Sequence, residues 1–427
     1  MNCESFGSCG SCTLGGSYED QILYKKQLIG DKFREFFDGE FEFFASQPQN
    51  YRIRAEFGIW HDIWHSAFDL AYTMGGARSK KILINECPKV ALPIANLMPR
   101  LLETLRWSEA LKEKLFGVEF ISCASGILAT LLYHKRLGER EQEAICELAD
   151  KLGIRVMARA RGQKLLSGEL SLTDELCVDG RVYKFRFGEN AFIQPNRGVN
   201  EKMIAWARSC VDFGKDGAGE MCAAQNFAAR NFTEKNFASQ NSAVQNYGCE
   251  KPAAQNSSCE KHAVRPESSA ARDLLELYCG HGNFTIPLAA KFNRVLASEI
   301  SKSSIANARI NCELNGVCNA QFIRLSADEL MSAFARKREF ERLKGIDIFS
   351  YDFSHVLIDP PRAGLEPSVI DFIKNFQNLI YISCNPQTLF ENLRSLCVTH
   401  EVRRFAIFDQ FAHTAHIECG VLLKRRS

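Results

Sequence analysis

Short apolar segments that alternate with helical stretches after residue 273 constrain the fold more than any other feature of the sequence. Each is rich in Leu, Ile or Val: DLLELYC, RVLASEI, AQFIRL, HVLIDPP, LIYISC, RRFAIF and CGVLL. Strands that alternate with helices are typical of a parallel sheet with helices on its faces. The last two segments lie close together in the sequence, which predicts a hairpin at one sheet edge. Residues 196–427 are therefore predicted to form an α/β domain.

The rest of the chain divides into three parts. Residues 16–195 mix strand-like runs with predicted helices near 18–37, 92–106 and 139–152, which indicates an α+β domain. Residues 1–15 are rich in Cys, Gly and Ser. Residues 215–270 repeat Gln-Asn and Cys-Glu-Lys and contain neither Leu nor Ile, so they are predicted to be a disordered, low-complexity insertion.

A strand runs into a glycine turn at Leu274–Phe284 (LLELYCGHGNF). The glycines allow the backbone to approach a ligand closely. Thr285 stands where a dinucleotide-binding turn has its third glycine, and the acidic Glu299 closes the next strand, where it can accept hydrogen bonds from ribose hydroxyls. This combination favours S-adenosylmethionine over a nicotinamide cofactor, although an ordinary tight turn remains the alternative.

Two prolines stop the strand that ends at Asp359, which places this carboxylate at the carboxyl edge of the sheet. That edge is where open α/β sheets bind ligands. A related Asp-Pro-Pro or Asn-Pro-Pro turn holds an exocyclic amine in amino-methyltransferases, so methylation of an adenine or guanine nitrogen is one interpretation.

The next strand favours different chemistry because it ends in Cys384-Asn385-Pro386. A thiolate there is suited to conjugate addition at C6 of a pyrimidine, which activates C5 to accept a methyl group. A base must then remove the C5 proton, and Glu418, in HIECG, is the best candidate because burial could raise its pKa. The alternatives are a buried strand-end cysteine and an ordinary surface carboxylate.

Four motifs in order, LLELYCGHGNFTIPLA, IDPPRAGLE, YISCNPQTL and FDQFAHTAHIECGVLL, resemble the tRNA (uracil-5-)-methyltransferases, as do FIQPNRGVNEKM and YRIRAEFGIWHD upstream. The resemblance implies a Rossmann-like class I methyltransferase domain, preceded by an RNA-binding domain, that methylates the T-loop uridine 54 of tRNA. It implies that Cys384 is the nucleophile and Glu418 the proton acceptor. It places S-adenosylmethionine against Gln194, Tyr278, Asn283, Glu299 and Asp359.

An RNA substrate needs cations for its phosphates and aromatic rings for stacking. Arg52, Arg54 and Lys135 lie beside Tyr51 and Tyr133, so residues 16–195 are predicted to grip the T-arm. Some members of the family also methylate tmRNA. Two other functions stay open: methylation of a 23S ribosomal RNA uridine, which the absence of room for an N-terminal oligonucleotide-binding barrel opposes, and a tRNA-folding chaperone.

Cys3, Cys9 and Cys12 have the spacing C-x5-C-x2-C, and Cys87 follows in INECPKV. Four thiolates hold zinc or iron–sulfur clusters. The arrangement is similar to the 4Fe–4S site of the ribosomal-RNA uracil-5-methyltransferases, so we expect a cluster, with zinc or a frayed terminus as alternatives.

The chain is expected to be cytoplasmic, with its 17 cysteines mostly reduced, because the first residues do not look like a signal peptide. No apolar run has the roughly 18–20 residues that span a bilayer, so no membrane association is expected. We expect no obligate protein partner. The net charge of +2 excludes a uniformly basic protein but allows a local basic groove.

Overall fold

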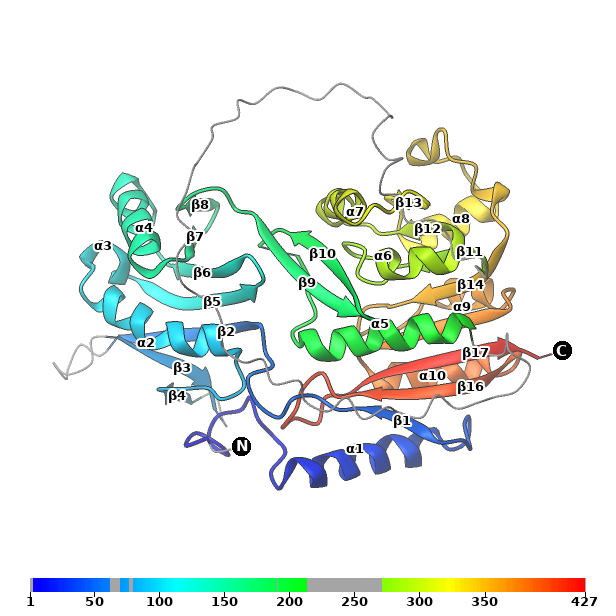
Figure 1. The fold of residues 1–427 in the computed structure, drawn as a ribbon, viewed down its shortest axis with the longest axis horizontal. Helices are drawn as coiled ribbons and strands as arrows, with labels where there is room; N and C mark the ends of the chain where they lie inside the picture. Colours follow the sequence, from blue (N-terminus) through cyan, green and yellow to red (C-terminus); the bar gives the residue numbers. More distant parts are fainter. Residues whose placement is uncertain (1–2, 62–69, 77–79, 190, 213–270, 427) are drawn as a thin grey trace.

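The computed structural model describes residues 3–61, 70–76, 80–189, 191–212 and 271–426, and it contains two large sheets that lie side by side (Figure 1). The predicted insertion at 215–270 lies outside the described residues. One sheet has eight strands, the other has seven, and a two-stranded hairpin lies between them.

The eight-stranded sheet contains all seven of the apolar segments predicted as strands from residue 273 onward. Its strands, in spatial order, are β1 (Phe41–Phe44), β16 (His400–Phe408), β17 (Glu418–Arg425), β15 (Asn378–Ser383), β14 (Phe353–Ile358), β11 (Ala271–Leu277), β12 (Phe292–Ser298) and β13 (Ala320–Ile323). β17 alone runs antiparallel to its neighbours. The predicted Rossmann-like α/β fold is confirmed, because β13-β12-β11-β14-β15 has the doubly wound strand order.

The two final strands form the predicted hairpin, but the hairpin does not end the sheet. β17 lies between β15 and β16, and β1 pairs in parallel with β16 on its outer side, with Phe41 opposite Phe405. The expectation of an edge hairpin was wrong because a strand more than 350 residues away in the sequence covers that edge. Pairing of this kind leaves no signal in local periodicity.

Helices cover both faces of this sheet because alternate strand residues are buried on opposite sides. Leu274, Leu357 and Ile380 pack on one face, with α5 (Arg197–Asp212), α6 (Thr285–Leu288) and α7 (Lys302–Asn315). Side chains from the other face of the same strands pack with the remaining helices of this layer, α1 (Tyr18–Phe33), α8 (Ala327–Phe334), α9 (Pro367–Ile373) and α10 (Pro386–Leu396). Short 3-10 helices in the described part of this layer occupy 289–291, 341–343 and 348–350.

The seven-stranded sheet has a core of its own. Its strands, in spatial order, are β4 (Lys81–Ile84), β3 (Leu70–Gly75), β2 (Arg54–His61), β5 (Leu115–Cys123), β6 (Gly126–Tyr133), β7 (Arg155–Ala160) and β8 (Gln163–Leu166). The buried side chains of one face pack against α2 (Leu92–Arg106), α3 (Glu109–Lys112) and α4 (Glu139–Leu152). The predicted helices at 92–106 and 139–152 are confirmed.

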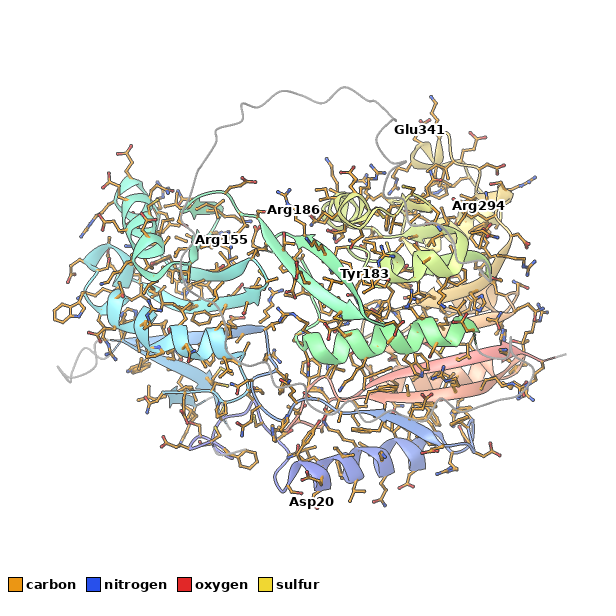
Figure 2. The ribbon with its side chains drawn as sticks, in the orientation of Figure 1. Asp20, Arg155, Tyr183, Arg186, Arg294 and Glu341 are labelled. Atoms are coloured by element: carbon orange, nitrogen blue, oxygen red, sulfur yellow. The ribbon has the colours of Figure 1, made fainter. Side chains whose placement is uncertain are left out.

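A hairpin of β9 (Leu172–Val178) and β10 (Arg181–Phe187) joins the two parts. The Arg186 amide donates to Asn311 Oδ1 on α7 at 2.6 Å, and the Lys184 amide donates to Asn315 Oδ1 at 2.9 Å. Figure 2 shows Tyr183 and Arg186 of this hairpin between Arg155 of the seven-stranded sheet and Arg294 of the eight-stranded sheet. The division at residues 195 and 196 stays a prediction, and α1 and β1 belong spatially with the eight-stranded sheet.

The helix predicted at 18–37 begins at its predicted start, after a capping box at Ser17, but it ends at Phe33 after sixteen residues. Among the described residues, no helix is long and apolar enough to span a bilayer.

Candidate functional site

The carboxyl ends of the parallel strands β11, β12, β14 and β15 meet at one edge of the eight-stranded sheet, and this edge faces the seven-stranded sheet (Figure 1). Leu277 at the end of β11 pairs with Ser298 of β12 and with Ile358 of β14. The residues that follow these strand ends are Tyr278, Glu299 and Asp359, so the register places Tyr278 between the two carboxylates. The topology therefore brings together three of the five residues predicted to contact the cofactor.

The glycine turn and Glu299 are hydrogen-bonded to each other. The Gly280 amide donates to Glu299 Oε2 at 3.2 Å, and the Ser301 amide, at the start of α7, donates to Glu299 Oε1 at 2.8 Å. Tyr278 has a φ of 62° and Gly282 a φ of 91°, so the backbone turns sharply here. These bonds orient the carboxylate while each of its oxygens keeps lone-pair capacity for a hydroxyl donor.

Gln194 and Asn283, the other two residues predicted to contact the cofactor, line one pocket between β10 and the glycine turn. Asn283 exchanges two amide hydrogen bonds of 2.9 Å with Asn200 of α5. Gln194 Oε1 accepts from Gln410 Nε2 at 3.3 Å. His281 lines the same pocket, and burial lowers its pKa to about 4, so its ring is neutral near pH 7.

Antiparallel pairing places Cys384 and Glu418 beside each other. Ser383, the last residue of β15, pairs with Cys419 of β17, so the next residue on each strand in that direction is Cys384 on one and Glu418 on the other. Asn385 caps α10 by accepting from the Gln387 amide at 3.1 Å, which stops the strand directly after the cysteine. The two predicted catalytic residues therefore lie on neighbouring strands at the carboxyl edge of the sheet.

Burial and neighbouring charges raise the pKa values of the acidic groups at this edge. Burial and, to a smaller extent, nearby Asp359 raise the pKa of Glu418 to about 8, while Arg362 opposes the shift. Burial raises the pKa of Asp359 to about 7. Burial, Glu418 and Asp359, in that order, also raise the pKa of the Cys384 thiol, and Arg362 lowers it. A buried carboxylate with a pKa near neutrality is suited to proton transfer.

Sequence reasoning missed Arg362, although it follows directly after the two prolines. Its Nη2 lies 3.3 Å from His416 Nδ1, and its carbonyl accepts from Asn385 Nδ2 at 3.0 Å. The guanidinium is the positive group that acts on both Cys384 and Glu418. Only the fold could reveal this, because the three residues come from different strand ends.

Glu276 of β11 is a second missed residue. It is 1% exposed, and burial raises its pKa to about 8. Within the described residues its Oε2 atom has no hydrogen-bond partner. The acidic residue in LLELYC is visible in the sequence, but its burial is not.

The three residues predicted to bind RNA have different surroundings. Arg52 lies with its guanidinium 5.6 Å from the centre of the Phe411 ring, near the strand-end site. Arg54 Nη1 donates to the Ala191 carbonyl at 3.1 Å, on the segment that carries Gln194. Lys135 lies in a separate place, with a side chain that is only 10% exposed and that forms an ion pair with Glu141 at 3.0 Å. The fold therefore brings Arg52 and Arg54 toward the site and Lys135 away from it.

Cys3, Cys9, Cys12 and Cys87 line one pocket, and all four are free thiols. Burial raises the pKa of Cys12; Lys89 lowers it, and the other three thiols of the set raise it. In the part of the chain that the structure describes, no three or more His, Cys, Asp or Glu side chains are arranged to hold a metal ion. The fold thus gathers the thiols but does not present a formed metal site.

Comparisons with known proteins show the family to which the chain is similar. A family model described as tRNA (Uracil-5-)-methyltransferase matches residues 17–240 and 243–426. A tRNA/tmRNA (uracil-C(5))-methyltransferase of Campylobacter concisus is 54% identical over 427 residues, covering 100% of both chains. A protein of the same name from Sulfurovum sp. is 41% identical over 430 residues and also covers 100% of both chains.

Among solved structures, the chain is similar to the Pyrococcus abyssi tRNA (uracil-54, C5)-methyltransferase in complex with S-adenosyl-L-homocysteine. The TM-score is 0.61 at 17% sequence identity, and the match covers 95% of this chain and 83% of that one. At this identity the likeness concerns the fold.

Proposed function

The chain belongs to the tRNA (uracil-5-)-methyltransferase family, and from this premise we propose that it transfers a methyl group from S-adenosylmethionine to C5 of a uridine in tRNA. The finer parts of the proposal are that the target is the T-loop uridine at position 54, that tmRNA is a second substrate, and that the enzyme works in the cytoplasm. The observation that carries the proposal is the pairing of β15 with β17, which sets a thiol beside a buried carboxyl at the cofactor edge.

S-adenosylmethionine supplies an electrophilic methyl group when it is bound. The residues present fit this cofactor: Glu299 is held by two backbone amides in the position of a ribose-binding carboxylate, and the turn from Tyr278 to Asn283 brings the backbone close. Asp359 lies across Tyr278 from Glu299, and Gln194 lines the adjoining pocket with Asn283. These five residues are proposed to hold the cofactor.

Cys384 is proposed to act first. Its thiolate attacks C6 of the uracil, the sulfur–carbon bond forms, and the electrons of the C5–C6 double bond move to the C4 carbonyl oxygen. Arg362 favours this step because its charge opposes the burial that raises the pKa of the thiol. C5 then carries electron density, and S-adenosylmethionine held by the five residues named above would supply the methyl group that C5 accepts.

Glu418 is proposed to complete the reaction. It removes the proton from C5, the C5–C6 double bond re-forms, and the thiolate of Cys384 leaves. With a pKa raised to about 8, the carboxyl is a stronger base than an exposed glutamate once it is ionised. The raised pKa has a cost, because much of the population is protonated at pH 7.

The T-arm of the tRNA is proposed to bind to the seven-stranded sheet and to the junction near Arg52 and Arg54. C5 of the target base is inaccessible inside a folded loop, so the uridine must turn out of its stack to reach Cys384. The position of Arg52 beside the loop that precedes Glu418 supports a role in holding the RNA backbone there.

The cysteine pocket carries a separate proposal, a 4Fe–4S cluster held by Cys3, Cys9, Cys12 and Cys87. Its support is the gathering of four thiols beside Lys89, whose charge favours thiolates. Protein purified without oxygen should contain about four iron atoms per chain, with visible absorption from thiolate-to-iron charge transfer. A colourless, iron-free preparation contradicts the cluster, and metal analysis of the same sample detects zinc.

One assay tests the proposed activity. Labelled S-adenosylmethionine is incubated with the protein and unmodified tRNA, tmRNA or ribosomal RNA, and the labelled nucleotide is mapped. We expect label at C5 of the T-loop uridine. Glu418→Gln should form a methylated covalent adduct with tRNA, because methyl transfer precedes proton removal. Label confined to ribosomal RNA contradicts the substrate, and tRNA refolding without any methyl transfer indicates a chaperone instead.

A further inference from the structure

The loop of residues 409–417 connects β16 to β17 and ends at the proposed base, Glu418. It lies at the junction of the two parts of the molecule, near the N-terminal segment (Figure 1). Cys384, in contrast, directly follows β15, a central strand of the sheet. The nucleophile and the base therefore depend on different parts of the structure for their positions.

Residues near the N-terminus hold the backbone of this loop. Carbonyl groups at three successive positions each accept hydrogen bonds from residues 13–51: Phe411 O from Lys25 Nζ at 3.2 Å, Ala412 O from the Tyr51 hydroxyl at 3.0 Å, and His413 O from the amides of Thr13 and Leu14 at 2.8 and 3.0 Å. The loop thus receives its main-chain partners from a segment distant in sequence.

Gln21 of α1 contacts both the backbone amide and the ring of His413. Its Oε1 atom accepts from the His413 amide at 3.0 Å, and its Nε2 atom lies 3.1 Å from the ring Nδ1. The ring Nε2 atom lies 2.7 Å from the Pro48 carbonyl. His413 has a φ of 65°, a backbone conformation that costs a non-glycine residue energy and that persists only when its surroundings impose it.

A buried ion pair anchors the first residue of the loop. Lys25 Nζ lies 2.6 Å from Asp409 Oδ1, and both side chains are 0% exposed. The Tyr18 hydroxyl donates to Asp409 Oδ2 at 2.7 Å, so both carboxylate oxygens are occupied. A buried ion pair of this kind contributes little net stability, because desolvation offsets the attraction, but it fixes geometry.

We infer that Gln21, Lys25 and Asp409 are positioning residues for the base: α1 and the 409–417 loop together hold Glu418 against the target carbon. This inference rests on the proposed role of Glu418. None of the three residues is proposed to touch substrate. The loop also contacts Gln194, Arg362 and Arg52, but a change at these groups acts before the adduct forms and lowers adduct and free product together. Misplacement of Glu418 alone acts after the adduct has formed, because the thiol that adds to C6 is positioned by the central strands.

A loosened loop should therefore slow proton removal more than methyl transfer. The enzyme would then accumulate as the methylated covalent adduct, with the Cys384 sulfur still bonded to C6. A general loss of folding has a different signature, because it removes adduct and free product in the same proportion.

The test uses the full chain with unmodified tRNA and labelled S-adenosylmethionine in a single turnover. The ratio of methylated adduct to free methylated tRNA is read from a denaturing gel. Gln21→Met leaves no buried charge, and the paired change Lys25→Met with Asp409→Asn removes both charges together. We expect each to raise the ratio by about tenfold, since small misplacements of a catalytic group cost one to two orders of magnitude in rate.

Glu42→Gln is the matched control. Glu42 of β1 accepts from Arg404 Nε of β16 at 2.9 Å and from Trp206 Nε1 at 3.0 Å, so it also ties the N-terminal segment to the sheet, but away from the loop. Its adduct ratio should match that of the unaltered protein. An unchanged ratio in Gln21→Met, while Glu418→Gln accumulates adduct, overturns the inference alone. Failure of Glu418→Gln to accumulate adduct overturns the proposed function and the inference with it.

Discussion

The carboxyl edge of the eight-stranded sheet and the surface of the seven-stranded sheet differ in whether their charged side chains are paired. At the carboxyl edge of the eight-stranded sheet, burial raises the pKa of the Asp359 and Glu418 side chains. Within the described residues, neither of these carboxyl groups accepts a hydrogen bond or forms an ion pair. On the seven-stranded sheet and its helices, cations are paired with acids, as in Lys135 with Glu141, Arg159 with Glu119 and Lys164 with Glu189.

This difference separates groups that react from groups that support the fold. An unpaired buried carboxyl costs stability, so its presence in a site points to chemistry rather than to packing. Paired charges near a surface contribute little either way. The comparison predicts that substitutions at the first set change catalysis and pH dependence strongly, whereas substitutions at the second set change little.

The largest effect is expected from Cys384→Ala. Removal of the nucleophile should lower tRNA methylation by about 10⁴-fold or more, because the addition step has no replacement. Cys397→Ala, which removes another half-buried thiol of the same domain, serves as the control and should retain activity. The measurement is the transfer of labelled methyl groups to tRNA. Comparable losses in both variants would contradict the assignment of the nucleophile.

A pH profile should show the buried base directly. Because burial raises the pKa of Glu418 to about 8, the ionised fraction falls about tenfold for each pH unit below that value. The rate at which the methylated adduct, in which Cys384 is no longer a thiol, releases its product should therefore rise by about 50-fold between pH 6 and pH 8 and level above about pH 9. A flat profile over this range would show that proton removal by Glu418 does not limit the reaction.

Stability should respond to the same carboxyl with the opposite trend. The unfolded chain has a glutamate pKa of about 4.3, and the folded value is raised to about 8. The folded state therefore binds the extra proton, and this stabilisation, complete at low pH, is lost as the pH rises from about 4 to 8. Glu418→Gln should abolish this pH-dependent loss of folding stability, because glutamine does not ionise.

Urea unfolding at pH 5 and pH 9 measures this effect. Relative to the unaltered protein, Glu418→Gln should gain of the order of 4 kcal/mol in the free energy of unfolding between the two pH values. Glu391→Gln, on the exposed face of α10, should gain less than about 0.5 kcal/mol. Equal gains in both variants would remove the distinction between the two sets of charges.

The smallest effects concern RNA binding. Lys135 already has three partners, Glu141, Glu113 and the Ala110 carbonyl, so Lys135→Met should change the tRNA dissociation constant by less than about twofold. Arg52→Met should weaken binding several-fold and reduce the salt dependence by about one phosphate contact. Filter binding at several salt concentrations measures both. A larger loss in Lys135→Met than in Arg52→Met would reverse the assignment.

Much of the fold was accessible from local sequence patterns. Alternating apolar segments predicted the α/β domain, and the helices at 92–106 and 139–152 were predicted with the observed bounds. The motif residues Glu299, Asp359 and Cys384 could be placed at strand ends because each lies next to a turn signal in its own segment. Their assignment as site residues still awaits experiment.

Contacts between distant segments were decided only by the tertiary structure. Nothing local shows that β1 pairs with β16, that α1 holds the 409–417 loop, or that Lys135 is already paired with Glu141. Even the adjacency of Cys384 and Glu418 follows from the antiparallel insertion of β17 beside β15. Side-chain type and local periodicity determine which groups are available and which elements form, whereas pairing between remote strands determines which groups meet and how deeply they are buried. Because burial sets the pKa, the chemistry of the site depends on the whole fold.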